Sequence, residues 1–215
     1  TQNNLIFQKL NFLNDWYLLL NWREKDLWDL EIYKSWKIYI QSVSSQIPVL
    51  VMNLKYNSKV LDVTSAPWSK TSQIADLMNN SWEIIANELN AIRIEKLKFT
   101  LNRQWVTNTK VIKNDARKLS EVLKWEMFDY ILADLPCSAE GRFKANIEKS
   151  FWFWKEEVVE NNSKLQKEIL DNIVWLLGNN WTLIYSTCTI SPEENEDVVE
   201  YLISAKALKG IWRIW

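Results

Sequence analysis

The chain has two cysteines, and each follows a short apolar run that is typical of a β-strand buried on both faces. Cys137 ends an Asp-Leu-Pro-Cys segment after the run 128–133, and Cys188 lies in a Ser-Thr-Cys-Thr segment after the run 181–185. The polar stretch between the runs is long enough for a helical crossover, which joins neighbouring parallel strands. Ligands of open α/β sheets bind beyond the carboxyl ends of the strands. We therefore expect both thiols to face one cleft.

The absence of histidine limits the chemistry that these thiols can do. Catalysis by a Cys/His or a Ser/His pair is excluded. A zinc ion would have to be held mostly by carboxylates, so we expect no metal. Two cysteines in 215 residues do not make a disulfide framework. Taken alone, the cysteines would more often be buried structural thiols than reactive ones.

From about residue 58 onward, the sequence alternates between the patterns of strands and helices. This alternation predicts an α/β fold with a mostly parallel sheet. The predicted strands cover residues 59–63, 83–87, 110–113, 128–133 and 181–185, and the predicted helices cover 70–78, 91–104, 161–177 and 193–203.

The N-terminal part of the chain has a different pattern. Residues 29–41 are aromatic and mixed, and residues 44–52 indicate a helix with Pro48 in its first turn. We expect residues 1–56 to form a small appendage and residues 57–215 to form the main domain. No apolar run is long enough to span a bilayer and no signal-peptide pattern is present, which favours a soluble, cytoplasmic protein away from membranes.

Acidic residues follow three of the predicted strands. Glu88 ends the second strand, where an acid commonly binds ribose hydroxyls, and Asp115 ends the third strand, within reach of an adenine amine. Asp134 lies next to the first cysteine segment. Strand-end acids also cap the helices that follow them, so this pattern alone leaves nucleotide binding and capping open.

Several motifs closely resemble those of the Sun (RsmB-like) RNA cytosine-5 methyltransferases. They occupy residues 60–71, 134–138 and 185–189 with 192–196, and residues 33–41 are also similar. The resemblance covers residues 24–203 and implies a Rossmann-like methyltransferase fold that binds S-adenosylmethionine over the turn 64–70. The cofactor-binding residues that it implies are Thr64, Ser65, Ala66, Pro67, Trp68, Ser69, Lys70, Glu88, Asp115 and Asp134.

The resemblance also implies a covalent mechanism. Cys188 would add as a thiolate to carbon 6 of cytosine, and Cys137 would assist product release. Asp134 would stabilise the charge that develops on the ring. Without histidine, the pKa of the nucleophile must be lowered by other groups, of which Lys70 is the strongest local candidate.

The implied substrate is a cytosine in ribosomal or transfer RNA, bound by a monomer. With a net charge of -1, the chain has no global basic field that would attract RNA. One face of the predicted helix 91–104 carries Arg93, Lys96 and Arg103, and it is better interpreted as a solvated surface than as an RNA-binding one. Arg142 and Phe143 are candidates for contacting a phosphate and stacking on a base. The alternative is an inactive RNA- or ribosome-binding module whose cofactor site is blocked by Trp68. DNA methylation is disfavoured because it needs no second motif thiol.

The chain has 3 glycines and 14 tryptophans, whereas average composition predicts about 15 glycines. The family pattern has glycine at Trp36, Trp68, Trp105 and Trp181, and Trp82 also lies at a turn. We hypothesise that UGA codons translated here as Trp encode glycine in the source organism; the alternative is a genuinely Trp-rich protein. The family also continues beyond both ends of the chain, so we expect a fragment that lacks the C-terminal edge strands of the sheet.

Overall fold

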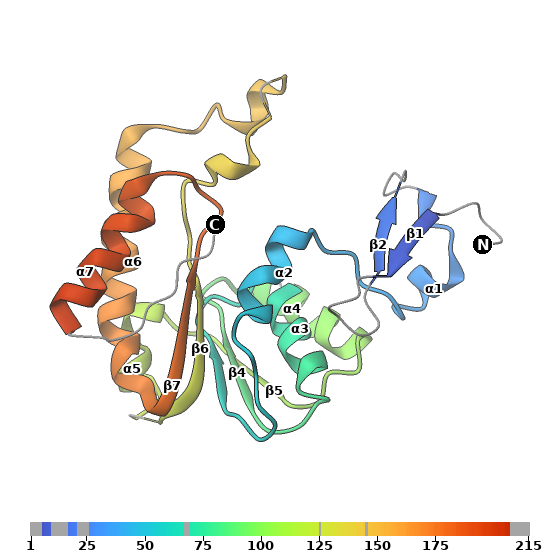
Figure 1. The fold of residues 1–215 in the computed structure, drawn as a ribbon, viewed down its shortest axis with the longest axis horizontal. Helices are drawn as coiled ribbons and strands as arrows, with labels where there is room; N and C mark the ends of the chain where they lie inside the picture. The colour runs from blue at the N-terminus through green and yellow to red at the C-terminus, as the bar shows by residue number, and fades with distance from the viewer. Residues whose placement is uncertain are drawn as a thin grey trace. The chain divides into compact units, whose positions relative to one another are not determined.

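The computed structural model describes residues 6–9, 17–20, 26–66, 69–124, 126–144 and 146–206 (Figure 1). The chain divides into two compact units, residues 1–40 and residues 41–215. Residues 41–56, which we expected in the appendage, therefore belong to the larger unit. Pro67 and Trp68 of the expected cofactor turn lie outside the described residues.

The smaller unit contains a short antiparallel hairpin and a single helical turn. Strands β1 (Ile6–Lys9) and β2 (Tyr17–Leu20) pair in the register Ile6 to Leu20, and α1 (Glu31–Lys34) follows them. The backbone N–H of Lys37 donates to the carbonyl of Ile32, which closes the C-terminal turn of α1.

A parallel sheet forms the centre of the larger unit. Its described strands, from one edge to the other, are β5 (Thr109–Ile112), β4 (Ile84–Asn87), β3 (Val60–Asp62), β6 (Phe128–Asp134) and β7 (Leu177–Ser186). All neighbouring pairs run parallel, so the predicted α/β fold is confirmed. Strand order reverses between β3 and β6, which places a topological switch point at their carboxyl ends.

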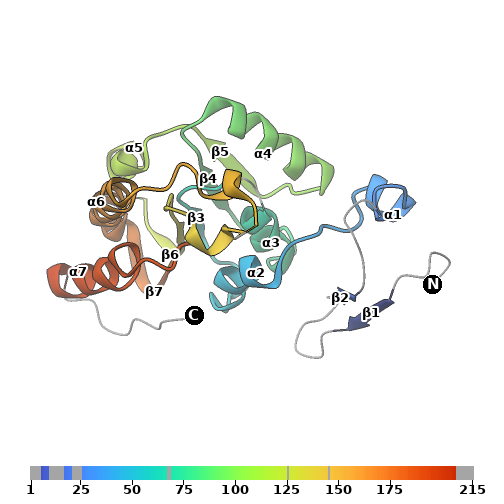
Figure 2. The same cartoon turned by 90° about the horizontal axis from the view of Figure 1, so that it is seen from above.

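Helices cover both faces of this sheet (Figure 2). Those with more than four residues are α2 (Val43–Leu50), α3 (Ser69–Leu77), α4 (Ala91–Arg103), α6 (Glu156–Ile173) and α7 (Glu196–Lys206); the shorter elements are α5 (Leu119–Val122), η2 (Ala116–Lys118), η3 (Glu140–Arg142), η4 (Glu148–Ser150), η5 (Val174–Leu176) and η6 (Pro192–Glu194). Helices α2, α3 and α4 pack on one face through Val49, Ile74 and Leu97. Helices α5, α6 and α7 pack on the other face. Because both faces are covered, β3 and β4 are buried along their whole length, as apolar parallel strands should be.

Two helices differ from their predicted positions. Ser42 caps α2 by accepting a hydrogen bond from the N–H of Ser45, and Pro48 therefore lies inside the helix, not in its first turn. Helix α6 begins at Glu156 and ends at Ile173, before the predicted bounds of 161–177. No helix in the described part of the chain is both long enough and apolar enough to cross a membrane.

Among the tryptophans that the structure describes, three have left-handed backbone conformations that favour glycine. The φ angles are 59° at Trp36, 58° at Trp82 and 53° at Trp105. Trp36 and Trp105 follow the C-caps of α1 and α4, and after each of them an N–H bonds back to a carbonyl five residues earlier. Glycine is the usual residue at this position of a helix-terminating turn because it has no Cβ to clash. This geometry supports the hypothesis that these tryptophans stand where the protein has glycine.

Candidate active site

The parallel pairing of β6 and β7 brings the two cysteine segments to one edge of the sheet. Asp134 is in register with Ser186 at the ends of these strands. The two Sγ atoms of Cys137 and Cys188 lie 3.2 Å apart, and the N–H of Cys188 donates to Sγ of Cys137 over 3.2 Å. The structure therefore brings together the two thiols that the sequence placed in one cleft.

Close approach of the backbone completes the thiol site. The N–H of Gly141 donates to the carbonyl of Cys188 at 3.0 Å. A Cβ atom at position 141 would lie 3.0 Å from that same carbonyl oxygen, closer than side chains normally come to a backbone. Glycine at this position therefore allows the segment after Cys137 to pass directly over the segment that contains Cys188.

The two thiols have opposite pKa shifts. The hydrogen bond from Cys137 lowers the pKa of Cys188 to about 7, with further help from the positive charges of Arg142 and Lys70. The same interaction, together with burial, raises the pKa of Cys137 above its ordinary value. Cys188 is therefore the thiol that ionises, and Cys137 keeps its proton as the donor.

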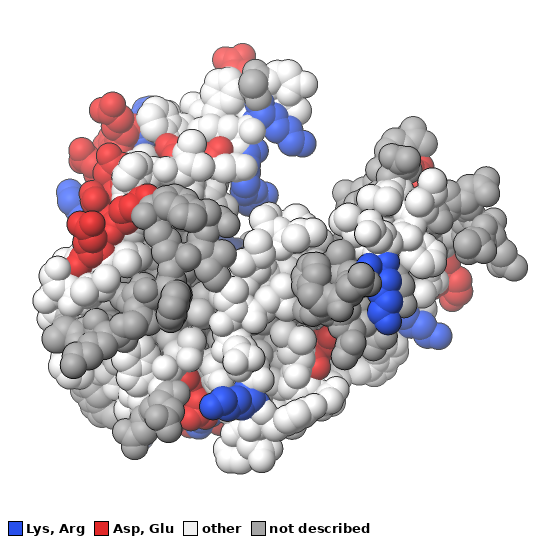
Figure 3. Space-filling view, viewed as in Figure 1, with Lys and Arg blue, Asp and Glu red and all other residues white. Residues whose placement is uncertain are grey.

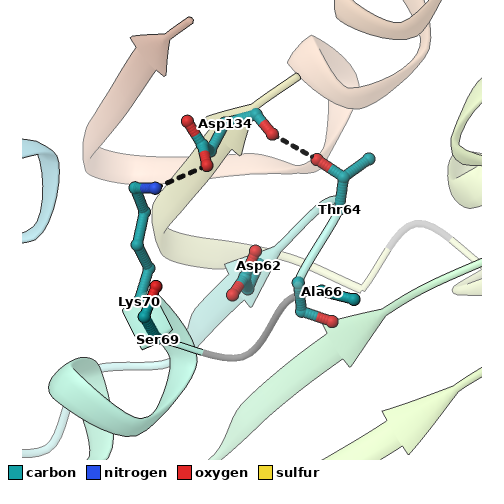
Figure 4. A pocket seen from close by; sticks show the side chains of 7 residues that line it. Asp62, Thr64, Ala66, Ser69, Lys70 and Asp134 are labelled. Carbon is teal, nitrogen blue, oxygen red and sulfur yellow. Dashed lines mark hydrogen bonds and ion pairs between the residues drawn. The ribbon is translucent and has the colours of Figure 1, made fainter. Parts of the chain in front are cut away.

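Lys70 lowers the pKa of Cys188 less than the sequence indicated, because its ammonium group is paired with Asp134. Nζ of Lys70 lies 2.6 Å from Oδ2 of Asp134, while Ser186 donates to Oδ1 of the same carboxylate at 2.7 Å. The hydroxyl of Thr64 donates to the Asp134 carbonyl at 2.6 Å (Figure 4). Asp134 is thus held from three sides, and Arg142, considered earlier only as an RNA contact, contributes more to the ionisation of Cys188 than Lys70 does.

A small hollow lies at the switch point, between the ends of β3 and β6 (Figure 4). Asp62, at the end of β3, is buried there and accepts a hydrogen bond from the hydroxyl of Thr71 at 2.6 Å. Burial, with the nearby charge of Asp134, raises the pKa of Asp62 to about 7. The residues that line the hollow are Asp62, Thr64, Ser65, Ala66, Ser69, Lys70 and Asp134.

Glu88 and Asp115 lie at the ends of β4 and β5, and both have partners within the chain. Oε1 of Glu88 accepts a hydrogen bond from the N–H of Asn90, and Oε2 lies 3.5 Å from Nε of Arg93. Asp115 caps η2 and forms an ion pair with Arg117, whose side-chain and backbone hydrogen bonds lower the pKa of the carboxyl. For Asp115, the capping role that the sequence left open is therefore present in the structure.

Sequence reasoning missed two buried polar residues that organise the strand ends. The amide of Asn87 donates to the carbonyls of Val63 and Asn114 and so ties β3, β4 and β5 together. The carboxylate of Glu194 is fully buried and accepts a hydrogen bond from the N–H of Ser138 at 3.1 Å. Glu194 belongs to the segment 192–196 that was noted for its resemblance, but nothing in the local pattern showed what it contacts.

The segment from Glu140 to Lys155 forms a lobe above the ends of β6 and β7 (Figure 1). The ring of Phe143 packs against those of Phe151 and Phe153, with centroids 6.1 Å away in each case. Phe143 therefore packs within the lobe. Trp152, which is 72% exposed, is the most exposed of the described aromatic side chains of the lobe. Lys and Arg side chains lie along the lower right flank of this lobe in Figure 3.

The sheet order, the helix layers and the hollow at the switch point define a Rossmann-like methyltransferase fold. The sequence profile of the 16S rRNA methyltransferases RsmB/F matches residues 49–211. The chain belongs to this family, so the resemblance noted in its motifs is confirmed.

Individual relatives agree with this assignment. The chain is 39% identical over 166 residues to the ribosomal RNA small subunit methyltransferase F of Escherichia coli O157:H7, and 39% identical over 168 residues to that of Serratia proteamaculans. These alignments cover 76% and 77% of the chain but only 34% and 35% of the relatives, so the chain spans about a third of their length.

Solved structures show the same architecture. NSun6 from Pyrococcus horikoshii, crystallised with the S-adenosylmethionine analogue SFG, is 31% identical, with a TM-score of 0.74 over 82% of this chain and 44% of its own. A methyltransferase homologue from the same organism is 25% identical, with a TM-score of 0.79 over 94% of this chain and 63% of its own.

Proposed function

We propose that this chain is the methyltransferase part of an enzyme that transfers a methyl group from S-adenosylmethionine to carbon 5 of a cytosine in small-subunit ribosomal RNA. The observation that supports this proposal best is the pair of thiols 3.2 Å apart at the strand ends, one with a lowered and one with a raised pKa. Family membership supports RNA methylation, and the small-subunit rRNA enzymes among the relatives favour ribosomal over transfer RNA as the substrate.

Cys188 is the proposed nucleophile. Carbon 5 of cytosine is a poor nucleophile, so a thiolate must first add to carbon 6 and push the ring electrons toward carbon 5. A thiol with a pKa of about 7 is substantially ionised at neutral pH, which meets this requirement. Negative charge develops on the pyrimidine ring during the addition. The Lys70 ammonium next to the thiols would stabilise this negative charge, and Asp134, which pairs with Lys70, would do so by sharing a proton with the ring nitrogen.

Cys137 is the proposed release residue. After methyl transfer, the proton on carbon 5 must leave and the bond between Cys188 and carbon 6 must break. In the covalent adduct Cys188 is a neutral thioether, so its charge no longer holds the proton on Cys137, and Cys137 can lose this proton to solvent. The Cys137 thiolate would then take the proton from carbon 5, the electron pair would restore the double bond between carbons 5 and 6, and Cys188 would leave as a thiolate. The two thiols therefore have separate tasks in one covalent cycle.

The hollow at the switch point fits the polar end of S-adenosylmethionine. It is lined by the hydroxyls of Thr64, Ser65 and Ser69 and lies at the start of α3, where backbone N–H groups favour a carboxylate. When bound, this cofactor supplies the methyl group. Glu88, buried at the end of β4, would accept hydrogen bonds from the ribose, and Asp115 lies at the end of the next strand for the adenine.

The lobe that follows Cys137 is the proposed contact surface for RNA beside the cytosine. Its exposed side chains include Lys144, Lys149 and Lys155, which can neutralise phosphates. Trp152 and Phe153 offer exposed rings on which unpaired bases can stack. The indole N–H of Trp154 donates to the Glu140 carboxylate, which also accepts a hydrogen bond from the hydroxyl of Thr189, so the lobe is anchored to the segment that contains Cys188.

Covalent trapping tests this proposal. Wild-type chain, Cys137→Ala and Cys188→Ala are incubated with small-subunit rRNA and S-adenosylmethionine and run on a denaturing gel. Cys137→Ala should accumulate a protein–RNA adduct because release fails, whereas Cys188→Ala should form none. An adduct formed only by the Cys188 variant would reverse the roles, and the absence of an adduct from both variants would refute the covalent mechanism.

A further inference from the structure

A network of buried hydrogen bonds joins the segment around Cys137 to the segment after Cys188, and Glu194 lies at its centre. The carboxylate of Glu194 is fully buried. Both of its oxygens lie 3.1 Å from the backbone nitrogen of Ser138, and Oε2 also accepts a hydrogen bond from the Ser138 hydroxyl. Ser138 directly follows Cys137, so Glu194 holds the backbone next to this thiol.

Helix α6 also contributes a residue to this network. Nε2 of Gln166, a fully buried residue, donates to Oε1 of Glu194 at 3.0 Å and to the carbonyl of Pro136 at 2.8 Å. Pro136 directly precedes Cys137. The residues on both sides of the thiol are thus attached to buried groups, one through Glu194 and one through Gln166.

The residue after Glu194 does the same for the other thiol segment. The side chain of Asn195 donates to the carbonyls of Thr189 and Ser191, and its Oδ1 accepts a hydrogen bond from the hydroxyl of Thr187 at 2.7 Å. Because Glu194 and Asn195 are adjacent, one short stretch of chain sets the position of both cysteine segments relative to each other.

We propose that Glu194 is a positioning residue that keeps Cys137 against Cys188, and this inference rests on the proposed function. Glu194 touches neither thiol, and it acts through Ser138 and the backbone of the intervening segment. Loss of a hydrogen bond to a buried charged group weakens an arrangement by a factor of roughly ten or more. Without the Glu194 carboxylate, Cys137 should leave its place beside Cys188. Covalent addition should then continue at a reduced rate because Cys188 loses its hydrogen bond from Cys137, and product release should slow by more because the release residue is displaced.

The first experiment repeats the trapping assay with Glu194→Gln, and Glu193→Gln serves as the matched control at an exposed neighbouring position. Glu194→Gln keeps the shape of the side chain, but it replaces one carboxylate oxygen by an amide NH₂ group, a donor that would face the donors of Ser138 or Gln166. We expect it to accumulate adduct as Cys137→Ala does, at a level about ten-fold above wild type. Adduct accumulation requires a folded chain, so a variant that is merely unstable would not give this result.

The second experiment measures how fast the two thiols form a disulfide in the absence of RNA and cofactor, because this rate depends on how close the thiols lie. Diamide takes up the two thiol hydrogens as a disulfide forms, and mass spectrometry follows the loss of two hydrogens from a chain whose only cysteines are these two. Wild-type chain and Glu193→Gln should oxidise at the same rate, and Glu194→Gln should oxidise roughly ten-fold more slowly. If Glu194→Gln does not fold, Ser138→Ala takes its place: it removes the hydroxyl contacts to Glu194 and Thr189 but keeps the backbone N–H bonds to Glu194, and it should slow oxidation by a smaller factor.

The two experiments separate this inference from the proposed function. If neither Cys137→Ala nor Cys188→Ala forms an adduct, the covalent mechanism fails, and the diamide rates alone decide the role of Glu194. If Cys137→Ala traps RNA but the folded Glu194→Gln chain releases product and oxidises like wild type, the positioning role is wrong. Slow oxidation with adduct accumulation supports it.

Discussion

The sulfur of Cys137 lies 3.2 Å from the sulfur of Cys188, and it also accepts a hydrogen bond from the Cys188 backbone. The pair therefore resembles a shared-proton site in which ionisation of one thiol is stabilised by the other. Burial alone would raise the pKa of both thiols, so the lowered pKa of Cys188 depends on its neighbours.

The rate of covalent addition should depend on pH through Cys188. Cys137→Ser keeps a hydrogen-bond donor beside Cys188, so adduct formation by this variant should increase with pH as the Cys188 thiolate forms and then level off. Removal of the guanidinium in Arg142→Gln should shift the midpoint to higher pH. Quenched-flow adduct measurements as a function of pH test both expectations, and a rate independent of pH would contradict the assignment of Cys188.

Removal of the Glu88 carboxylate should weaken cofactor binding. The loss of a charge-assisted hydrogen bond typically costs about 1.5 to 3 kcal/mol, so affinity for S-adenosylmethionine should fall roughly ten-fold to a hundred-fold in Glu88→Ala. Glu95→Ala is the control, because Glu95 is an exposed residue on α4 that pairs only with Lys98 among the contacts described. Titration calorimetry of both variants decides; equal affinities would refute the ribose role of Glu88.

Replacing Trp105 by glycine should stabilise the chain. Its φ of 53° costs a residue with Cβ about 1 kcal/mol relative to glycine, and the side chain is 63% exposed, so little burial is lost. Trp152→Gly is the control, because Trp152 is also exposed but lies outside the left-handed residues. Urea unfolding should show a higher midpoint only for Trp105→Gly. In addition, peptides from the source cells should contain glycine at positions 36, 82 and 105.

Trp68→Gly should increase affinity for S-adenosylmethionine more than any other single Trp-to-Gly change. Position 68 lies in the turn that the family uses for this cofactor, and glycine there permits close approach of the backbone to the ligand. Calorimetry on Trp68→Gly and Trp105→Gly separates an effect on the site from an effect on stability. A Trp68 chain that binds as tightly as its glycine variant would exclude the recoding hypothesis at this position and would also remove the reason to expect an inactive binding module.

The lobe should account for part of the salt dependence of RNA binding. In Lys144→Ala/Lys149→Ala, affinity for a single-stranded rRNA fragment should decrease, and the slope of log affinity against log salt should become shallower by about 1.4. Lys96→Ala/Lys98→Ala on α4 serves as the matched control because we interpret that face as solvated. If the α4 variant changes the slope and the lobe variant does not, RNA lies on the other surface.

The sequence by itself determined which strands form and which chemical groups stand at their ends. Apolar runs such as 130–133 have apolar side chains on both faces, and this pattern suits a parallel sheet covered by helices on both sides. The local pattern also indicated a turn at Trp82, and the family resemblance indicated glycine positions at Trp36 and Trp105; all three residues have a left-handed backbone, which glycine tolerates better than tryptophan.

Only the tertiary structure decided how the side chains at the strand ends are paired. The ion pair of Lys70 with Asp134 joins residues on different elements, and so does the hydrogen bond from Ser138 to the buried carboxylate of Glu194. Such contacts depend on strand register and helix packing, which bring distant residues within about 3 Å of each other and carry no local sequence signal. For the same reason, the sequence did not indicate that Arg142 promotes the ionisation of Cys188, because this effect depends on where the lobe lies relative to the thiols.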